Sequence, residues 1–320
     1  MTDKIRILHT GDWHIGSFPG PEKDGENCRA ADIRRCLEGL VGEAVTLHPD
    51  VIVVAGDIFH QARVWRDRAL KESQIAIETI RQLAVIAPIV VMRGTPNHDS
   101  AEQFHSLELA FEYDRRVHIV TEPCVKVVSL DRGETIQIAC VPGFDRGYYR
   151  SKHPGLSKED ENAVFTAAIE KLIIGLKAQM ENDLPSVLVS HFTITGCNME
   201  SGQTAFLSQF EPVVYPSTLV TADYDLVCFG HIHRPQQLDG CKSTFYCGAI
   251  SGLNFNDEGQ ERGFYIHDMD YSECKTERCL VSQFRRLPTR QFLTIRLDDD
   301  DVRSPTLISI HDHWKNHSLD

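Results

Sequence analysis

The chain has 320 residues, of which 42% are hydrophobic and 25% are charged. These values are typical of folded globular proteins and exclude a disordered or fibrous chain. Its 33 Lys and Arg residues against 46 Asp and Glu residues give a net charge of −13. That charge excludes a protein that grips nucleic acid over its whole surface, but not an enzyme with local basic patches or bound cations.

The predicted elements alternate between strands and helices. In chain order, apolar runs and helical spacing predict strand 5–10, helix 29–47, strand 51–55, helix 67–87, strand 88–92, helix 103–113, strands 117–120, 125–130 and 136–141, helix 162–180, and strands 186–190, 226–229, 244–247 and 263–268. The run 51–55 is continuous and β-branched, as in a strand buried on both faces. This alternation predicts a layered α/β domain.

The composition shifts after about Asp268. Two further strands are predicted over 274–283 and 291–297, followed by four consecutive acids at 298–301 and a polar tail. We therefore predict a main domain over residues 1–280 and a short C-terminal extension over 281–320, because so short an extension cannot bury a core of its own.

No segment predicts membrane insertion, secretion or a disulfide framework. The longest apolar runs, such as 86–92, are too short to span a bilayer, and residues 1–4 are not an apolar signal region. The ten cysteines include no Cys-x-x-Cys pair. We therefore expect a reduced, cytoplasmic protein with no membrane partner.

A residue able to bind a metal ion follows or ends each of five predicted strands. In chain order these residues are Asp12, His14, Asp57, Asn97, His191, His231 and His233. Because ligands of open α/β sheets bind at the carboxyl ends of the strands, one site can collect all of them. Each of these residues alone is better explained as part of a turn or as a hydrogen-bonded core histidine. Those explanations do not account for all of them together, in this order and each at a strand end.

Seven oxygen and nitrogen ligands are too many for one metal ion and suit a pair. Two ions about 3.5–4 Å apart clamp the attacking and leaving oxygens of a displacement at phosphorus, and they lower the pKa of a bound water. Asp57, which is central in the order, can bridge the two ions. Mn²⁺, Fe²⁺, Zn²⁺ and Mg²⁺ all stay open, and the carboxylates and the amide favour Mn²⁺.

His98 and Asp99 follow Asn97 directly. If Asn97 is a ligand, His98 projects into the same cleft, where a cationic imidazole can stabilise phosphoryl charge or protonate the leaving oxygen. Asp99 can then fix the tautomer of His98 and raise its pKa. The alternative interpretation is that His98 is a turn residue.

These motifs resemble those of the calcineurin-like metallophosphoesterases and, within that superfamily, those of the SbcD-type DNA repair nuclease subunits, which pair with SMC-like ATPases. The resemblance covers about residues 4–252. It rests on Leu8-His9-Thr10-Gly11-Asp12-Trp13-His14-Ile15-Gly16, Gly56-Asp57-Ile58-Phe59-His60, Asn97-His98-Asp99, Ser190-His191-Phe192 and Gly230-His231-Ile232-His233. It implies a two-layered β-sandwich flanked by helices.

The resemblance also implies a division of the ligands between two ions. One ion is held by Asp12, His14, Asp57 and His233, and the other by Asp57, Asn97, His191 and His231. His98 acts on the transition state or the leaving group, and His60 matches a histidine that positions the substrate in some nuclease members. His60 is equally well explained as a capping residue after Phe59.

The sequence departs from the family pattern in two places. Pro96 stands where the family usually has Gly, and Gly94 comes two residues earlier, so we expect a reshaped loop before Asn97. About forty residues follow Leu280, where family members usually carry a DNA-capping domain and a helical ATPase-docking region. The chain is therefore either a form with a truncated capping domain or a minimal stand-alone nuclease, and an SbcC-like ATPase partner stays open.

Basic residues near the predicted cleft are candidates for substrate contacts. Arg63 and Arg66 follow His60, and Arg146 and Arg150 follow a predicted strand. Phosphate contacts and a solvated surface are equally expected for each of them. The helices over 67–87 and 103–113 offer a face either for a homodimer or for packing against the sheet.

We predict a metal-dependent DNA exo- and endonuclease, with Mn²⁺ as the favoured ion, acting in DNA repair or recombination. The first alternative is a phosphodiesterase or phosphatase with the same chemistry on small molecules or proteins. The second is a non-catalytic partner subunit of an SMC-like ATPase, against which the complete ligand set argues.

Overall fold

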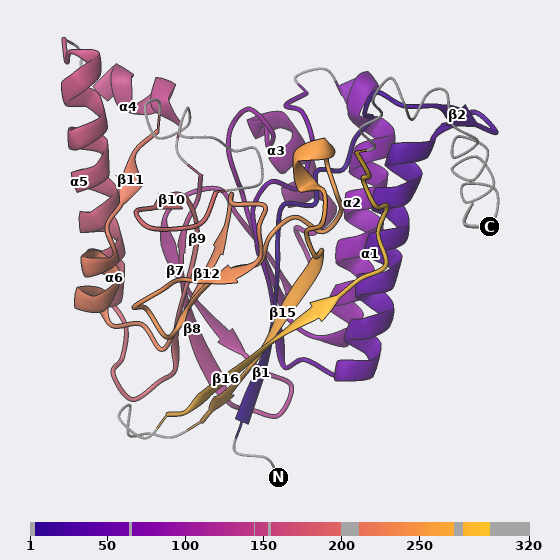
Figure 1. Ribbon diagram of the computed structural model, residues 1–320. Coiled ribbons are helices and arrows are strands. Elements are labelled where there is room, and N and C mark those ends of the chain that lie inside the picture. Colours follow the sequence, from indigo (N-terminus) through magenta and orange to yellow (C-terminus); the bar gives the residue numbers. More distant parts are fainter. Residues whose placement is uncertain are drawn as a thin grey trace, which may run out of the picture.

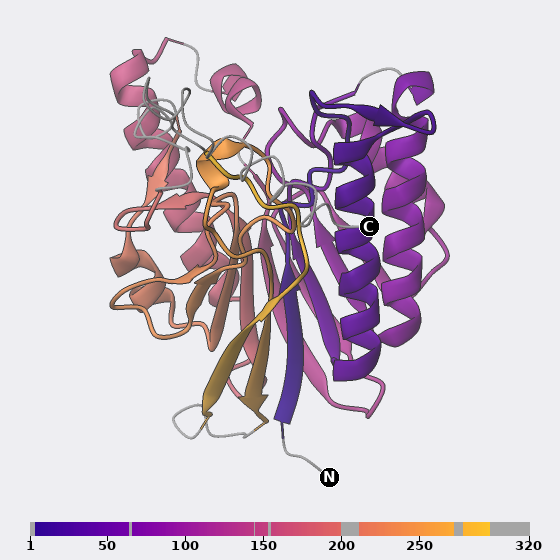
Figure 2. The ribbon, with the colours of Figure 1, turned by 45° about the vertical axis from the view of Figure 1, so that its right-hand side comes forward.

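Two β-sheets stacked face to face form the centre of the protein. The structure is a computed structural model that describes residues 4–63, 66–143, 145–152, 155–199, 211–271 and 278–294. Within these residues each of the two large sheets has six strands, and helices cover both outer faces (Figure 1 and Figure 2). This arrangement confirms the predicted two-layered sandwich flanked by helices.

The first sheet has a parallel centre and an antiparallel edge. In spatial order it contains β16 (Leu280–Arg286), β15 (Gly263–Asp270), β1 (Lys4–Thr10), β4 (Val51–Ala55), β5 (Ile89–Met92) and β6 (Val117–Val120). Strands β1, β4, β5 and β6 run parallel, and β15 and β16 extend the sheet by antiparallel pairing. The carboxyl ends of four strands therefore meet at one edge.

The second sheet repeats this plan. In spatial order it contains β13 (Gln236–Gln237), β14 (Thr244–Tyr246), β12 (Leu226–Gly230), β9 (Ser186–His191), β8 (Thr135–Val141) and β7 (Cys124–Ser129). Strands β8, β9, β12 and β14 run parallel, while β7 and β13 pair antiparallel at the two edges. Its parallel strands end at the same side of the molecule as those of the first sheet (Figure 1).

Helices complete the two outer layers. Helices α1 (Cys28–Leu47), α2 (Arg66–Ile86) and α3 (Ala101–Ala110) cover the first sheet, and α5 (Lys158–Lys177) and α6 (Pro216–Ala222) cover the second (Figure 1). Within the described part of the chain, no helix is both long enough and apolar enough to cross a bilayer.

The alternation of side chains along each strand divides the core into layers. Ile7 and Val53 lie in the layer between the two sheets, whereas Leu8 and Ile52 face the helices over the first sheet. Successive side chains of a strand point to opposite faces, so a strand covered on both sides needs a continuous apolar run. This two-sided burial explains the β-branched sequence of β4.

The structure differs from the predicted elements at several short segments. The helix predicted over 103–113 spans Ala101–Ala110, because Ser100 and Gln103 form a capping box at its start. Residues 291–294 do not form the predicted strand, and 295–297 lie outside the described residues. The pattern also missed the short elements α4 (Arg146–Lys152), α6, β2 (Glu22–Lys23), β3 (Glu26–Asn27), β10 (Thr193–Ile194), β11 (Val213–Val214) and β13.

The segment after the predicted boundary packs onto the main domain. Strand β16 pairs with β15 over its whole length, and the side chain of Leu287 is buried in the core beside α1. The hydroxyl groups of Thr289 and Ser251 lie 3.1 Å apart. Residues 280–290 therefore pack against the sandwich. The part of the predicted extension beyond residue 294, which includes the acidic run, lies outside the described residues.

One cluster of metal-ligand residue types lies in the core away from the predicted site. Candidate ligand atoms of His9, Cys228 and His267 lie within 4.8 Å of one another. Each imidazole nitrogen has a partner, since His9 contacts the Phe229 carbonyl at 3.2 Å and His267 at 3.4 Å, and His267 contacts Ser282 at 2.8 Å. Burial lowers the pKa of His9 to about 3. We therefore assign this neutral, hydrogen-bonded chain to the core.

A buried ion pair anchors the loop after β12. Arg262 Nη2 lies 2.6 Å from Asp257 Oδ1, with side-chain exposures of 1% and 0%. Arg262 also donates a hydrogen bond to the carbonyl oxygen of His233. The pair therefore connects the stability of the fold to the position of a predicted ligand.

We expect Asp257→Ala to lower the free energy of unfolding by about 3–5 kcal/mol, because it leaves a buried guanidinium without its counter-charge. Urea denaturation measures the loss. The exposed Asp239→Ala serves as control and should change stability by less than about 0.5 kcal/mol. Equal stability of the two variants would contradict a structural role for the pair.

Candidate metal centre

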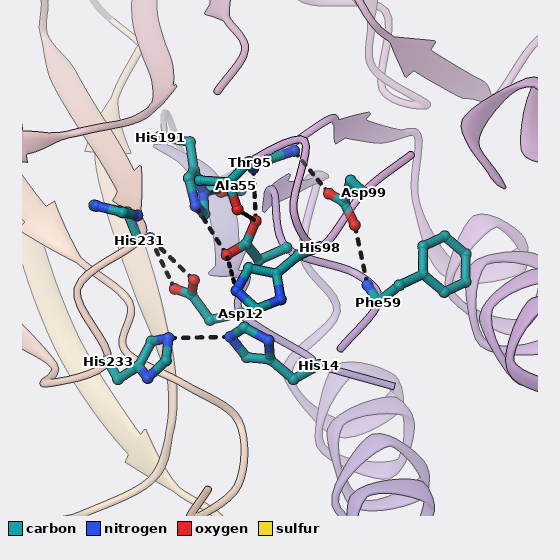
Figure 3. Close-up of polar contacts among 12 residues, drawn as sticks. Asp12, His14, Ala55, Phe59, Thr95, His98, Asp99, His191, His231 and His233 are labelled. Atoms are coloured by element: carbon teal, nitrogen blue, oxygen red, sulfur yellow. Dashed lines mark hydrogen bonds and ion pairs between the residues drawn. The ribbon is translucent and has the colours of Figure 1, made fainter. Parts of the chain in front are cut away.

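The predicted ligands lie where the parallel strands of both sheets end. Asp12 and His14 follow β1, Asp57 follows β4, His191 ends β9, and His231 and His233 follow β12. The side chains of Asp12, His14, His98, His191, His231 and His233 lie around one centre (Figure 3). The sandwich thus brings together side chains that are more than two hundred residues apart in sequence.

Two glycines allow the sheets to approach each other closely at this edge. A Cβ atom at Gly230 would lie 2.2 Å from the carbonyl oxygen of Ala55 on the facing sheet. Gly56 has a φ of +89°, and a Cβ atom there would lie 2.6 Å from Nδ1 of His191. Any larger residue would therefore push β4 away from β9 and β12.

The backbone bends sharply at four of the predicted ligands. Asp12, His14, Asp57 and His231 have φ values of 47°, 49°, 51° and 86°. Residues other than glycine seldom adopt this left-handed conformation, which costs on the order of 1–3 kcal/mol each and concentrates at functional sites. The surrounding packing holds these strained turns and directs their side chains inward.

A first triad consists of Asp12, His14 and His233. Their candidate ligand atoms lie within 4.8 Å of one another, and Nε2 of His14 lies 3.0 Å from Nε2 of His233. The backbone N–H of His231 donates to both carboxylate oxygens of Asp12, at 3.0 and 3.1 Å. This bond holds the Asp12 carboxylate at the loop after β12.

A second triad consists of Asp57, His191 and His231, with ligand atoms again within 4.8 Å. His191 uses Nδ1 to donate a hydrogen bond to the carbonyl oxygen of Ala55 at 2.6 Å, and its Nε2 lies 3.2 Å from Asp57 Oδ2. Thr95 donates two hydrogen bonds to the other oxygen, Asp57 Oδ1, from its backbone N–H at 2.7 Å and its hydroxyl at 2.9 Å. These outer contacts fix both ligands in orientation.

Burial and mutual charge set the protonation of the two triads. Burial raises the pKa of Asp12, and it lowers the pKa of His233 to about 3. Burial also acts to lower the pKa of His191, but the Asp57 carboxylate outweighs it and raises that pKa to about 10. Burial acts to raise the pKa of Asp57, yet His191 and His98 lower it well below its usual range.

These groups fit two divalent cations. Each triad combines carboxylate oxygens with imidazole nitrogens, the donor set of Mn²⁺, Fe²⁺ and Zn²⁺ in proteins. The carboxylates are buried, and buried charges are stable only when opposite charge compensates them. Cations held between the triads would supply that compensation.

Comparison with known proteins decides the family. A model of the calcineurin-like phosphoesterase family matches residues 5–235, a range that contains every predicted ligand. The chain belongs to the calcineurin-like phosphoesterase family. The family name describes enzymes that hydrolyse phosphate esters, which agrees with a site of carboxylates and imidazoles at the strand ends.

A curated relative refines this comparison. The chain is 26% identical over 290 residues to the SbcD subunit of the nuclease SbcCD from Escherichia coli, covering 85% of this chain and 66% of that protein. Among solved structures, the calcineurin-like phosphoesterase YfkN from Bacillus subtilis is similar with a TM-score of 0.45 and 13% identity over 88% of this chain and 90% of that one. A dimetal phosphatase from Danio rerio has a TM-score of 0.43 and 11% identity over 86% and 98%.

Asn97, the one amide among the predicted ligands, lies in the loop after Thr95 and Pro96 of this phosphoesterase site. It is exposed, and within the described chain its side chain makes no hydrogen bond to either triad. It lines a pocket of about 310 Å³ together with His191 and His231. Thr95, two residues earlier, donates two hydrogen bonds to Asp57.

His98 lies at the centre, but its partner is not the one predicted. Its Nδ1 lies 2.5 Å from the carbonyl oxygen of His60, and its Nε2 lies 3.9 Å from Asp57 Oδ2. The Asp99 carboxylate instead accepts hydrogen bonds from the backbone N–H groups of Phe59 at 3.0 Å and Gly94 at 2.7 Å. Asp99 therefore clamps two loops together, and the carbonyl of His60 orients His98.

The side chain of His60 packs beside the first triad. Its ring centroid lies 3.8 Å from that of Phe18 and 6.0 Å from that of His14. Burial, together with a smaller effect of His98, lowers the pKa of His60 to about 4. A neutral imidazole at this position can donate to or accept from a bound substrate.

The predicted arginines are mostly engaged elsewhere. Arg63 lies 3.9 Å from Glu72 and lines a groove between α2 and α3. Arg146 lines the pocket but pairs with Glu161 at 3.0 Å, and the same carboxylate pairs with Arg150 at 2.7 Å. Arg66 begins α2, and its side chain lies outside the described structure.

Sequence reasoning missed Thr95 and Glu211. Thr95 holds Asp57, and Glu211 Oε2 lies 2.9 Å from His231 Nε2. The contact of Thr95 with Asp57 depends on the path of its loop, which no strand pattern specifies. Glu211 follows no predicted strand, so no pattern of ligands at strand ends could have found it.

We expect Asp57→Ala to abolish binding of both ions, because Asp57 lies in the second triad and also interacts electrostatically with His14 of the first. Metal analysis after dialysis against Mn²⁺ measures the bound ions per chain. Asp239→Ala, an exposed acid outside the pocket lining, is the matched control. Two ions retained by Asp57→Ala would refute its bridging position.

We expect Thr95→Val to weaken metal binding by about 10–100-fold, since outer partners that orient a ligand typically contribute that much. Thr95→Ser keeps the hydroxyl donor to Asp57 and should bind nearly as the wild type does. Isothermal titration with Mn²⁺ compares the three proteins. The assignment is wrong if the Val and Ser variants bind alike.

Proposed function

We propose that this phosphoesterase is a metal-dependent DNA nuclease that hydrolyses phosphodiester bonds with two divalent ions. Mn²⁺ is the favoured ion for both positions. The observation that carries the proposal is the pair of buried Asp/His triads at the strand ends. The similarity over 85% of the chain to a protein named as part of a nuclease supports DNA as the substrate. We extend to this chain a role in DNA repair or recombination in the cytoplasm.

In the proposed mechanism the residues hold the reacting groups in place. Paired divalent ions, when bound, neutralise phosphoryl oxygens and make hydroxide available near neutral pH. One ion would be held by Asp12, His14 and His233. The other would be held by Asp57, His191 and His231. The turns that carry them are strained and tightly packed, so the ligands need little reorganisation when substrate arrives.

His98 is the residue that we propose acts on the leaving group. Its Nδ1 is held by the carbonyl oxygen of His60, so Nε2 is directed toward Asp57 and the centre. A proton on Nε2 can be donated to the departing sugar oxygen, or can stabilise charge on the phosphoryl group before bond cleavage.

The relative's name describes one subunit of a nuclease, and this chain spans 66% of that protein's length. We therefore propose an SbcC-like ATPase as the partner of this chain. Co-purification of the chain with such an ATPase, and stimulation of cleavage by ATP, test the partnership separately from the chemistry.

A phosphodiesterase acting on small molecules is the second candidate. The pocket beside the second triad is small, about 310 Å³, and Asp145 and Glu211 are part of its lining. Arg146 and Arg150 are both paired with Glu161, so neither is freely available for a DNA backbone. A compact diester fits these features better than a long polyanion does.

End-labelled single- and double-stranded DNA, assayed with and without Mn²⁺, separates the two candidates. We expect metal-dependent release of nucleotides or short fragments. Turnover confined to bis-p-nitrophenyl phosphate or to a cyclic nucleotide would favour the small-molecule enzyme. If a chain loaded with two ions hydrolyses none of these diesters, the result would favour the alternative of a non-catalytic partner subunit.

We expect His98→Ala to retain both ions and to lower kcat by about 10²–10⁴-fold, because a positioned acid or base contributes that much. Steady-state rates and metal analysis on the same sample give both readouts. His105→Ala, an exposed histidine on α3, is the control. Near wild-type kcat for His98→Ala would show that the leaving group needs no proton from it.

A further inference from the structure

Glu211 lies at the second triad, although no step of the mechanism above uses it. It precedes β11, and its Oε2 lies 2.9 Å from Nε2 of His231. The side chain is 33% exposed, and it lines the same pocket as His191 and His231. The carboxylate therefore approaches the candidate metal site from within the pocket.

The half-buried carboxylate of Glu211 is stabilised by a positive charge beside it. Partial burial removes some of its hydration, which a counter-charge or hydrogen-bond donors compensate. Among the described residues, Glu211 pairs with His231 alone. A metal ion at Nε2 of His231 would use the lone pair and require a neutral imidazole, so this pairing cannot persist when the ion binds.

When an ion binds at Nε2 of His231, the ion itself is the positive charge nearest to Glu211. Adjacent ligands on one ion, with bonds of about 2.0–2.2 Å, lie about 3 Å apart. The observed 2.9 Å between Glu211 Oε2 and His231 Nε2 matches that separation. A small movement of Glu211 toward Asp57 and His191 would therefore complete the ligation.

The family resemblance assigns Asn97 as an oxygen donor to this ion, and Asn97 lines the same pocket as His191 and His231. Its side chain is exposed in the structure, and Thr95 occupies one oxygen of Asp57. Glu211 offers a charged oxygen in the lining of the same pocket. A third carboxylate would also reduce the excess positive charge of two divalent ions.

We propose that Glu211 is an additional ligand of the ion held by Asp57, His191 and His231. The inference rests on the two-metal site of the proposed function and is independent of whether DNA is the substrate. A further carboxylate ligand favours hard ions such as Mn²⁺ and Mg²⁺.

Mn²⁺ titration of the full chain by calorimetry tests the proposal without any substrate. We compare wild type with Glu211→Ala, Glu211→Gln and Asn97→Ala, and use the exposed Glu112→Gln as control. We expect Glu211→Ala to weaken one of two Mn²⁺ sites at least tenfold and leave the other within about twofold, with Glu211→Gln intermediate because it keeps an oxygen. Electron paramagnetic resonance should then show loss of the signal of a coupled manganese pair.

The outcomes separate this proposal from the nuclease proposal. Unchanged Mn²⁺ affinities in Glu211→Ala and Glu211→Gln, or a loss seen only in Asn97→Ala, would overturn the role of Glu211. A wild-type chain that binds no Mn²⁺ would overturn both proposals. A chain that binds two ions through Glu211 but cleaves no DNA would overturn the nuclease proposal alone. Should Glu211→Ala fail to fold, the isosteric Gln variant carries the test.

Discussion

The close approach of the two sheets at their carboxyl ends is the constraint on which the site depends. Gly230 of β12 lies so near Ala55 of β4 that no side chain fits between them. The same carbonyl of Ala55 holds the imidazole of His191. The contact that closes the sandwich is therefore also the contact that orients a candidate ligand, so stability and function share one set of atoms.

That shared role explains why strain and buried charge collect at one edge. The apolar layers on either side hold left-handed turns at Asp12, Asp57 and His231 that would relax in a looser structure. Two carboxylates and several imidazoles are buried there together, which costs folding energy unless cations or protons balance the charges. The buried charges therefore lower the stability of the protein without cations, and binding of cations raises it.

The layered α/β class and the gathering of the predicted Asp and His ligands at one edge could be predicted from strand period and strand order, whereas the two-layered sandwich was expected from the family resemblance. Apolar runs such as Val51–Ala55 mark buried strands, and the residues after them must share an edge. Thr95, Glu211 and the partner of Asp99 could not be predicted, because they depend on how loops fold back across the pocket. The same limit applies to the exposure of Asn97, which lies in one of these loops.

The charge of the molecule bears on how it can hold its substrate. The chain carries a net charge of −13, and the pocket lining includes two acidic residues, Asp145 and Glu211. Glu161 already neutralises Arg146 and Arg150. Under the proposed function, a phosphodiester that enters this pocket would meet attraction chiefly from the two metal ions, so the ions that activate the reaction would also provide much of the binding. Affinity and turnover would then rise together as the metal site fills, unlike in an enzyme that binds its polyanion through a separate basic surface.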